Sequence, residues 1–238
     1  MPVSTDRSTE IAHNLAALHQ RMPRHAALVA VSKTKPASDV IAAASAGQRL
    51  FGENYVQEAL MKQAELQANW PEVAPTLEWH FIGPLQSNKC REIAEHFDWL
   101  HTLDRPKLVP LLANARSKSD TRLGARLNVL IQVNIDGEAT KSGCAEAEIS
   151  ALARLIAGFD SLALRGLMAI PNPNGDLGAS FAAMQRCFHA LQMQMSAEFP
   201  SHTALCDSLS MGMSDDFELA CAHGATLIRV GSGIFGAR

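Results

Sequence analysis

A lysine that directly follows an apolar run is the first residue of this sequence whose position suggests chemistry. The stretch AVSKTKP places Lys33 at the end of Leu28–Ser32, a run that predicts a buried strand. An amine in a partly desolvated pocket loses proton affinity and becomes a nucleophile, as Schiff-base formation with an aldehyde requires. A lysine at a strand end more often simply extends its amine to water, so the pattern alone does not assign a chemical role. Lys35 is the alternative amine and ranks lower, because it precedes Pro36 and lies further into the loop.

Two glycine- and serine-rich segments near the C-terminus have the composition of an anion-binding site. One is SLSMGMSDD, just before a predicted helix, and the other is RVGSGIFG; their candidate residues are Ser210, Gly212, Ser214, Gly231, Ser232 and Gly233. Glycines let backbone N–H groups approach an anion closely, and a helix start adds a favourable dipole. The alternative is that the glycines only turn the chain and that Ser214 caps the helix. On the pattern alone the two interpretations are equally supported.

An arginine within the last apolar run completes the set of candidate residues. Arg229 directly precedes Val230 in LIRV, and a guanidinium inside an apolar strand is costly unless it finds a partner. A nucleophilic lysine, a phosphate site and a buried cation together predict pyridoxal 5′-phosphate (PLP) as the cofactor. In this hypothesis the Schiff base forms at Lys33, the phosphate lies near Ser210 and Gly231, and Arg229 faces the pyridine nitrogen.

Eight short apolar runs predict the strands that must position these residues. Several are continuous, such as VLIQV and LIRV, as expected of parallel strands buried on both faces. The predicted strands are Leu28–Ser32, Arg49–Gly52, Glu78–Ile82, Trp99–Thr102, Asn128–Asn134, Leu164–Ala169, Ala204–Leu209 and Thr226–Val230.

Helical stretches alternate with these runs, and one further helix precedes them. The predicted helices are Thr9–Met22, Ser38–Ala46, Asn54–Leu66, Ser87–Phe97, Pro106–Ser117, Ala145–Gly158, Leu177–Phe199 and Ser214–His223. This length and alternation predict an α/β fold, a single (β/α)8 TIM barrel over residues 1–238 with an extra N-terminal helix. Functional residues of such barrels lie at the carboxyl ends of the strands. A doubly wound open sheet also fits the alternation, but no GxGxxG follows the first strand.

Composition and charge exclude several classes of protein. With 24 acidic and 21 basic residues the net charge is −3, so the basic excess of a general nucleic-acid binder is missing. The longest charge-free stretch, Cys187–Ala197, is too short to span a membrane, and the polar N-terminus is no signal peptide. The five cysteines show no metal-ligand spacing, so we expect reduced thiols, no metal and a cytoplasmic protein.

Six colinear stretches resemble the pyridoxal phosphate homeostasis protein family, the YggS-like proteins. They are AVSKTKP, FGENYVQEA, EWHFIGPLQSNK, RGLMAI, LSMGMSDDFELA and IRVGSGIFGAR, and they span nearly the whole chain. The resemblance implies a fold-type III PLP barrel, similar to the N-terminal domain of alanine racemase, with PLP bound to Lys33. The further cofactor-binding residues that it implies are Asn54, His80, Met168, Ser210, Arg229, Gly231 and Ser232. The chain ends at Arg238 without the short polar tail of relatives, which leaves these motifs intact.

Some of these residues have ordinary alternative roles. Asn54 is also suited to cap the helix that follows it. His80, on an apolar strand, is more often a hydrogen-bonded core histidine than a functional group. Lys141 in GEATKSG follows the fifth strand and is either a transient PLP acceptor or a solvated loop lysine.

The resemblance implies a PLP-binding homeostasis factor with no established catalytic activity. Alanine racemase-type chemistry uses a tyrosine from a second domain, and we expect none here, because the chain ends with the barrel and its one tyrosine is Tyr55. An arginine at the pyridine nitrogen would also leave that atom unprotonated and weaken the ring as an electron sink. We therefore expect no catalytic residues, but a monomer that holds PLP on Lys33 and buffers it or passes it to PLP-dependent apo-enzymes. Two alternatives stay open: an amino-acid racemase-like PLP enzyme, and a PLP-independent Schiff-base aldolase acting on a phosphorylated sugar.

Overall fold

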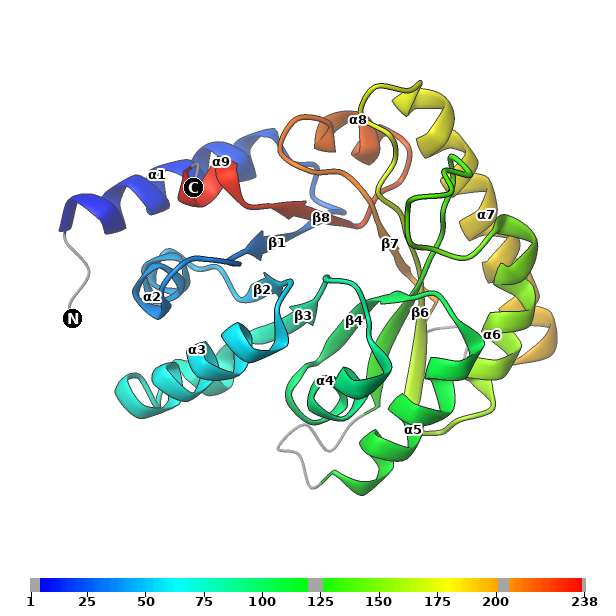
Figure 1. Cartoon of the computed structure of the whole chain (residues 1–238). Helices are drawn as coiled ribbons and strands as arrows, with labels where there is room; N and C mark the ends of the chain where they lie inside the picture. Colours follow the sequence, from blue (N-terminus) through cyan, green and yellow to red (C-terminus); the bar gives the residue numbers. More distant parts are fainter. Residues whose placement is uncertain (1–4, 120–125, 201–205, 237–238) are drawn as a thin grey trace.

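Eight parallel strands close into a barrel, because β8 pairs with β1 as well as with β7 (Figure 1). The computed structural model describes residues 5–119, 126–200 and 206–236. The predicted (β/α)8 TIM barrel is thereby confirmed. The strands are β1 (Ala27–Val31), β2 (Leu50–Glu53), β3 (Glu78–Phe81), β4 (Trp99–Leu103), β5 (Leu127–Gln132), β6 (Leu162–Met168), β7 (Ser208–Ser210) and β8 (Leu227–Val230).

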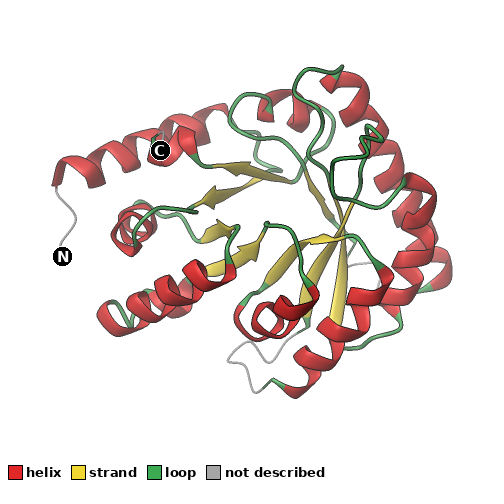
Figure 2. Ribbon diagram, viewed as in Figure 1, coloured by secondary structure: helices red, strands yellow, loops and turns green. Residues whose placement is uncertain are grey.

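Helices surround the barrel and cover its outer surface (Figure 2). They are α1 (Thr5–Arg21), α2 (Ala37–Ser45), α3 (Val56–Asn69), α4 (Cys90–His96), α5 (Val109–Lys118), α6 (Ile149–Ala157), α7 (Leu177–Glu198), α8 (Phe217–Ala222) and α9 (Ser232–Phe235). Short 3-10 turns lie at Ala74–Thr76, Ser87–Lys89, Pro106–Leu108 and Glu146–Glu148. No helix of the described residues is both long and apolar enough to cross a membrane.

The helix α1 is the predicted extra N-terminal helix and begins four residues earlier than expected. Its buried apolar residues are Ile11, Leu15 and Leu18. The Arg7 guanidinium donates to the Asp39 carboxylate of α2 at 2.7 Å and to the Phe235 carbonyl of α9 at 2.8 Å. These bonds hold the first and last helices side by side (Figure 1).

Alternation along the strands divides the core into two parts. Ile228 and Val230 of β8 pack in the main core between barrel and helices, whereas Leu227 belongs to a second cluster. That second cluster consists of Val29, Trp99, Leu130, Met168 and Leu227, each at an inward-facing position of its strand. Buried polar side chains share the barrel interior with it, and they connect to the functional site described below.

Most predicted elements differ from the structure by a few residues at their ends, three of them next to the site or in β7, and α9 was not predicted. The last predicted helix begins at Phe217, not Ser214, because the Asp216 carboxylate accepts the Met213 N–H in a turn before it. The helix expected from Asn54 begins at Val56, so Asn54 is not its cap. The predicted seventh strand, Ala204–Leu209, begins only at Ser208 in the structure, and residues 204 and 205 lie outside the described residues.

Candidate functional site

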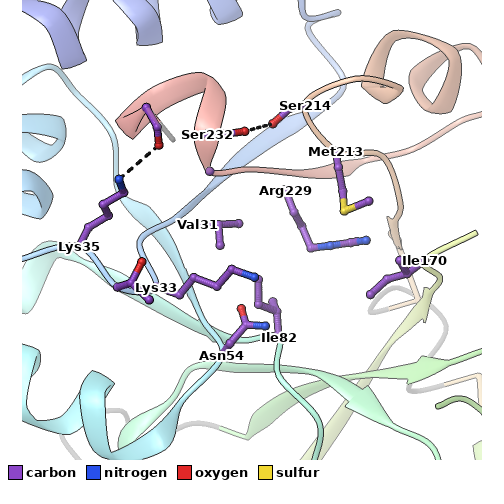
Figure 3. A pocket seen from close by; sticks show the side chains of 13 residues that line it. Val31, Lys33, Lys35, Asn54, Ile82, Ile170, Met213, Ser214, Arg229 and Ser232 are labelled. Atoms are coloured by element: carbon purple, nitrogen blue, oxygen red, sulfur yellow. Dashed lines mark hydrogen bonds between the residues drawn. The ribbon is translucent and has the colours of Figure 1, made fainter. Parts of the chain in front are cut away.

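A cavity of about 300 Å³ opens at the carboxyl ends of the strands, where a TIM barrel places its functional residues (Figure 3). Its size is at the small end of the range for small-molecule sites. Its lining residues are Val31, Lys33, Thr34, Lys35, Asn54, Ile82, Ile170, Met213, Ser214, Arg229, Gly231, Ser232 and Gly236. Five of the eight predicted cofactor residues line it, namely Lys33, Asn54, Arg229, Gly231 and Ser232.

Lys33 lies directly after β1 and its side chain extends into the cavity (Figure 3). The backbone on either side of it is held in place. The Ser32 carbonyl accepts a hydrogen bond from Lys62 Nζ at 2.7 Å, and the Thr34 N–H donates to the Glu58 carboxylate. Thr34 has a φ of 64°, in the left-handed region that β-branched residues rarely adopt. The half-buried Lys33 amine therefore leaves the barrel wall in a fixed direction.

A buried ion pair that was not among the predicted features lies behind this turn. Lys62 of α3 contacts the Glu53 carboxylate at the end of β2, and both side chains are almost fully buried. The Ser32 hydroxyl donates to the same carboxylate at 2.7 Å. Burial raises the pKa of Glu53, while Lys62 and Ser32 act in the opposite direction. One signal was present in the sequence: Glu53 stands in FGEN, at a predicted strand end.

Lys35, the second amine of SKTKP, also lines the cavity, but its side-chain nitrogen is hydrogen-bonded to backbone carbonyls at and just after the end of α9. Lys35 Nζ donates to the carbonyls of Phe235 and Gly236, at 3.1 and 3.2 Å. Figure 3 shows its side chain directed toward α9, whereas that of Lys33 runs toward Asn54 and Ile82. The geometry thus agrees with the lower rank of Lys35 as a nucleophile.

Arg229 places a buried cation in the cavity wall. Its Nη1 donates to the Ser210 hydroxyl at 2.6 Å and its Nη2 to the Ala169 carbonyl at 3.0 Å. Burial lowers the pKa of Arg229 to about 10, and the charge of Asp216 opposes this effect. The guanidinium is therefore still a cation at neutral pH, and no carboxylate of the described residues forms an ion pair with it.

The wall at the start of α9 combines a glycine backbone with two serine hydroxyls. A Cβ at Gly231 would lie 3.2 Å from the Val31 carbonyl oxygen, so a side chain there would press against β1. The hydroxyls of Ser214 and Ser232 lie 3.3 Å apart on this wall (Figure 3). Two hydroxyls beside backbone without a side chain form a surface that suits a phosphate group.

Asn54 supplies an unsatisfied polar atom next to Lys33. Its Oδ1 is buried and has no hydrogen-bond partner within residues 5–119, 126–200 and 206–236, although Asn54 lies in the cavity wall. Gly83 packs so closely on the Asn54 backbone that a Cβ there would lie 2.1 Å from the Asn54 carbonyl oxygen. A buried polar atom without a partner is costly, so Oδ1 is a group that a ligand would satisfy.

Three of the predicted cofactor residues, His80, Met168 and Ser210, do not line the cavity. Each is fully buried in the barrel interior. His80 bonds to other side chains, which agrees with its alternative role as a satisfied core histidine. Lys141 does not line the cavity either and pairs with Glu138 at 2.8 Å.

The ionisable groups of the lining are all basic. They are Lys33, Lys35 and Arg229, and no aspartate, glutamate, histidine, cysteine or tyrosine is among the lining residues of the described chain. Tyr55 is 53% exposed and does not contribute. No metal-binding group of three or more His, Cys, Asp or Glu occurs in the described ranges. The cavity is thus suited to an anionic ligand and offers one accessible amine.

The fold and this cavity define a barrel of the alanine racemase N-terminal domain class, and residues 7–238 match that family. An alanine racemase of Corynebacterium glutamicum has the same barrel, with a TM-score of 0.67 at 18% identity over 97% of this chain and 61% of that one. That similarity shows the fold alone.

Closer relatives share the sequence as well. The pyridoxal phosphate homeostasis protein of Pseudomonas aeruginosa is 50% identical over 218 residues, which is 92% of this chain and 87% of that protein. PipY of Synechococcus elongatus PCC7942, solved with PLP bound, has a TM-score of 0.80 and 39% identity over 95% of this chain and all of that one. The chain belongs to the pyridoxal phosphate homeostasis protein family.

Proposed function

We propose that this protein binds PLP in the cavity at the strand ends, as a Schiff base on Lys33, and serves PLP homeostasis by holding and releasing the cofactor. The proposal rests on one observation: the Lys33 amine, the Arg229 cation and the wall of Gly231 and Ser232 line the same cavity. The PLP bound to PipY supports it by analogy.

The lining residues fit the chemical groups of PLP. When bound, PLP supplies an aldehyde that condenses with an amine, forming a C=N bond and releasing the aldehyde oxygen as water. Lys33 supplies that amine, and the hydroxyls of Ser214 and Ser232 bind the phosphate together with backbone N–H groups near Gly231. Arg229 would face the pyridine nitrogen, and the unsatisfied Asn54 Oδ1 would accept a hydrogen bond from the protonated nitrogen of the Schiff base.

Holding PLP without turnover is part of the proposal. Exchange of a substrate proton from both faces of the ring needs two proton carriers, and the described lining has no acidic group or tyrosine to stand opposite Lys33. An arginine at the pyridine nitrogen keeps that nitrogen unprotonated, so the ring withdraws electrons weakly. Both features favour storage of PLP over catalysis.

A spectrum of the protein with and without PLP tests the binding site. We expect a visible Schiff-base band in the wild-type protein, its loss in Lys33→Ala, and its retention in the matched control Lys35→Ala. Borohydride reduction followed by peptide mapping should find the pyridoxyl group on Lys33 and not on Lys141. A colourless wild-type protein after incubation with PLP would contradict the proposal. That result would instead agree with the PLP-independent aldolase.

Hydrogen exchange at Cα separates a carrier from a racemase-like enzyme. The loaded protein is incubated with each amino acid in D2O, and deuterium at Cα is followed by NMR. We expect no amino acid to exchange faster than with free PLP. Rapid exchange that is lost in Lys33→Ala would instead establish a PLP enzyme.

The remaining part of the proposal is that the protein is a cytoplasmic monomer. It would deliver PLP to PLP-dependent apo-enzymes. The described cysteines are all free and buried, as is usual in a reducing compartment. Transfer is tested by mixing the loaded protein with an apo-enzyme and a scavenger of free PLP. Activation that survives the scavenger supports direct transfer, and sedimentation gives the oligomeric state.

A further inference from the structure

Five side chains form a continuous hydrogen-bonded chain through the barrel interior, from the cavity to the opposite end of the strands. Arg229 Nη1 contacts Ser210 Oγ at 2.6 Å, and Ser210 Oγ contacts His101 Nδ1 at 3.0 Å. His101 Nε2 lies 2.9 Å from His80 Nδ1, and His80 Nε2 lies 3.0 Å from Glu78 Oε1. The two histidines are fully buried, while the Glu78 side chain is 42% exposed at the start of β3. The chain therefore links the buried cation to a carboxylate that reaches solvent.

The chemistry of the two ends gives this chain one direction. Arg229 can only donate, so Ser210 Oγ accepts and its own proton is donated to His101 Nδ1. His101 then donates from Nε2 to His80 Nδ1, and His80 donates from Nε2 to the Glu78 carboxylate. Every donor has one acceptor, and both histidines are neutral with the proton on Nε2. Burial, together with the nearby Arg229 cation, lowers the pKa of His101 well below its usual value, which agrees with a neutral ring.

The opposite direction leaves groups unsatisfied. If His80 donated from Nδ1 to His101, then His101 would donate from Nδ1 to Ser210, whose oxygen already accepts from Arg229. The Ser210 proton would then have no acceptor among the hydrogen bonds of the described residues. His80 would also need a second proton to keep its bond to Glu78, which adds a cation to the barrel interior.

The surroundings of Glu78 keep its carboxylate negatively charged. The hydrogen bond from His80 lowers the pKa of Glu78, against the effect of burial, and Trp99 and Arg165 lower it further. Arg165 is itself paired with Asp207 and lies over the Trp99 ring, which stacks on His80. At the other end, Asp216 is the acidic group that acts on Arg229. Glu78 is thus ionised at neutral pH.

We propose that Ser210, His101, His80 and Glu78 are positioning residues that orient and polarise Arg229 toward the pyridine nitrogen of PLP. The inference rests on the proposed function, since it needs PLP in the cavity. The charge of Glu78, at the far end of the barrel, then influences the proton affinity of the Schiff base on Lys33. Removal of that charge leaves the Arg229 cation less compensated and disfavours the protonated Schiff base, which is itself a cation.

Histidine NMR on the PLP-free wild-type protein tests the direction of the chain. Nitrogen-15 spectra distinguish a protonated from a bare ring nitrogen, so they report the tautomer of each ring. We expect both His80 and His101 to be neutral, with the proton on Nε2 and a bare Nδ1. A proton on Nδ1 of either ring, or a cationic ring at neutral pH, overturns the inference.

A pH titration of the bound PLP tests the coupling. The visible spectrum gives the pH at which the Schiff base loses its proton, and we expect Glu78→Gln to lower that pH by about half a unit, as charges across a medium of effective dielectric constant near 20 would do. Glutamine keeps the hydrogen bond from His80 possible and removes only the charge. The matched control is Glu72→Gln. Glu72 is exposed in the turn that precedes β3 and is not one of the five hydrogen-bonded side chains.

The outcomes separate this inference from the proposed function. A Glu78→Gln protein that titrates like wild type and like Glu72→Gln shows that the chain only fills the core, and overturns the inference alone. A wild-type protein that forms no PLP band contradicts the proposed function and the inference with it. A purely structural role would change stability but not the pH at which the Schiff base titrates.

Discussion

One buried cation, Arg229, lines the cavity and another, Lys62, lies behind it, and their charges are balanced in different ways. Lys62 touches the carboxylate of Glu53 directly and lies 3.3 Å from that of Glu58. Arg229 contacts only a hydroxyl and a carbonyl, and a chain of neutral side chains connects it to Glu78. Both residues are at most 5% exposed. The difference between the two therefore does not come from burial.

This difference shows which cation remains available to a ligand. The charge of Lys62 is neutralised at contact, so it stabilises the turn before Lys33 and attracts no anion. The charge of Arg229 is compensated only at a distance, so its field extends into the cavity and would attract an anionic ligand there. The first network holds the backbone around Lys33 in place, and the second leaves a cation facing the cavity.

The largest expected effect comes from breaking the direct pair. Lys62→Met should lower the free energy of unfolding by about 3–5 kcal/mol, because it leaves the Glu53 carboxylate buried without a counter-charge. The Ser32 hydroxyl would then be the one remaining donor to this carboxylate among the hydrogen bonds of the described residues, and the other Glu53 oxygen has no partner there. Urea unfolding measures the change. The double variant Lys62→Met with Glu53→Gln should recover at least half of the loss, and failure to recover any would show that charge is not the cause.

Removal of the Arg229 cation should lower the stability less than removal of Lys62 does, and should lower the affinity for PLP more. Arg229→Met leaves only neutral groups unsatisfied, so we expect a loss of about 1–2 kcal/mol in the free energy of unfolding. The affinity for PLP should fall at least tenfold, measured by the visible band against the concentration of PLP. Equal losses of stability in Arg229→Met and Lys62→Met would mean that the two cations are balanced alike.

Glu78, at the far end of the hydrogen-bonded side chains from Arg229, should make a pH-dependent contribution to the free energy of unfolding. The folded-state pKa of Glu78 is lowered, so its contribution to stability is present above the unfolded pKa of about 4.5 and is lost as the pH falls through the folded pKa. The free energy of unfolding of the wild-type protein should therefore exceed that of Glu78→Gln at neutral pH. The difference should be at most about 1 kcal/mol, because water screens the partly exposed carboxylate. The gap should close at acidic pH. Urea titrations at several pH values measure it, and a gap that is constant with pH would contradict the assignment.

The smallest expected effect concerns the strained turn after Lys33. Thr34→Gly removes a β-branched side chain from a φ of 64°, which should raise stability by about 0.5–1 kcal/mol, reduced by the greater backbone entropy of glycine in the unfolded chain. We expect PLP to dissociate faster all the same, because the Lys33 backbone becomes less rigid. Thermal unfolding and the decay of the visible band give the two quantities. A slower release of PLP would show that the strain does not help to position Lys33.

Much of the fold was predictable because its signals are local. Continuous apolar runs such as LIRV predict buried parallel strands, and their alternation with helices predicts the barrel, which pairing of β8 with β1 confirms. Bounds were less predictable where a side chain redirects the backbone, as Asp216 does before α8. The short helix α9 has only four residues, too few for a helical pattern to be visible in the sequence.

Part of the site was also predictable from residue type and position. Lys33 and Arg229 were singled out because charged side chains at apolar strands need a polar partner or an opening, and both line the cavity. His80 and Met168 were assigned by resemblance, and the structure places them in the barrel interior instead. Strand periodicity shows only that a residue faces inward; it does not give the depth of its side chain in the barrel.

By itself the sequence determined the barrel, the lysine at the end of its first strand and the arginine of its last, because these follow from apolar patterning and the position of charges along single strands. Only the tertiary structure decided which groups neutralise each buried charge. Glu53 meets Lys62 from another element, and Arg229 reaches Glu78 through side chains of β7, β4 and β3. The physical reason is that hydrogen bonds depend on distances of about 3 Å between atoms far apart in the chain, and closure of the barrel sets those distances.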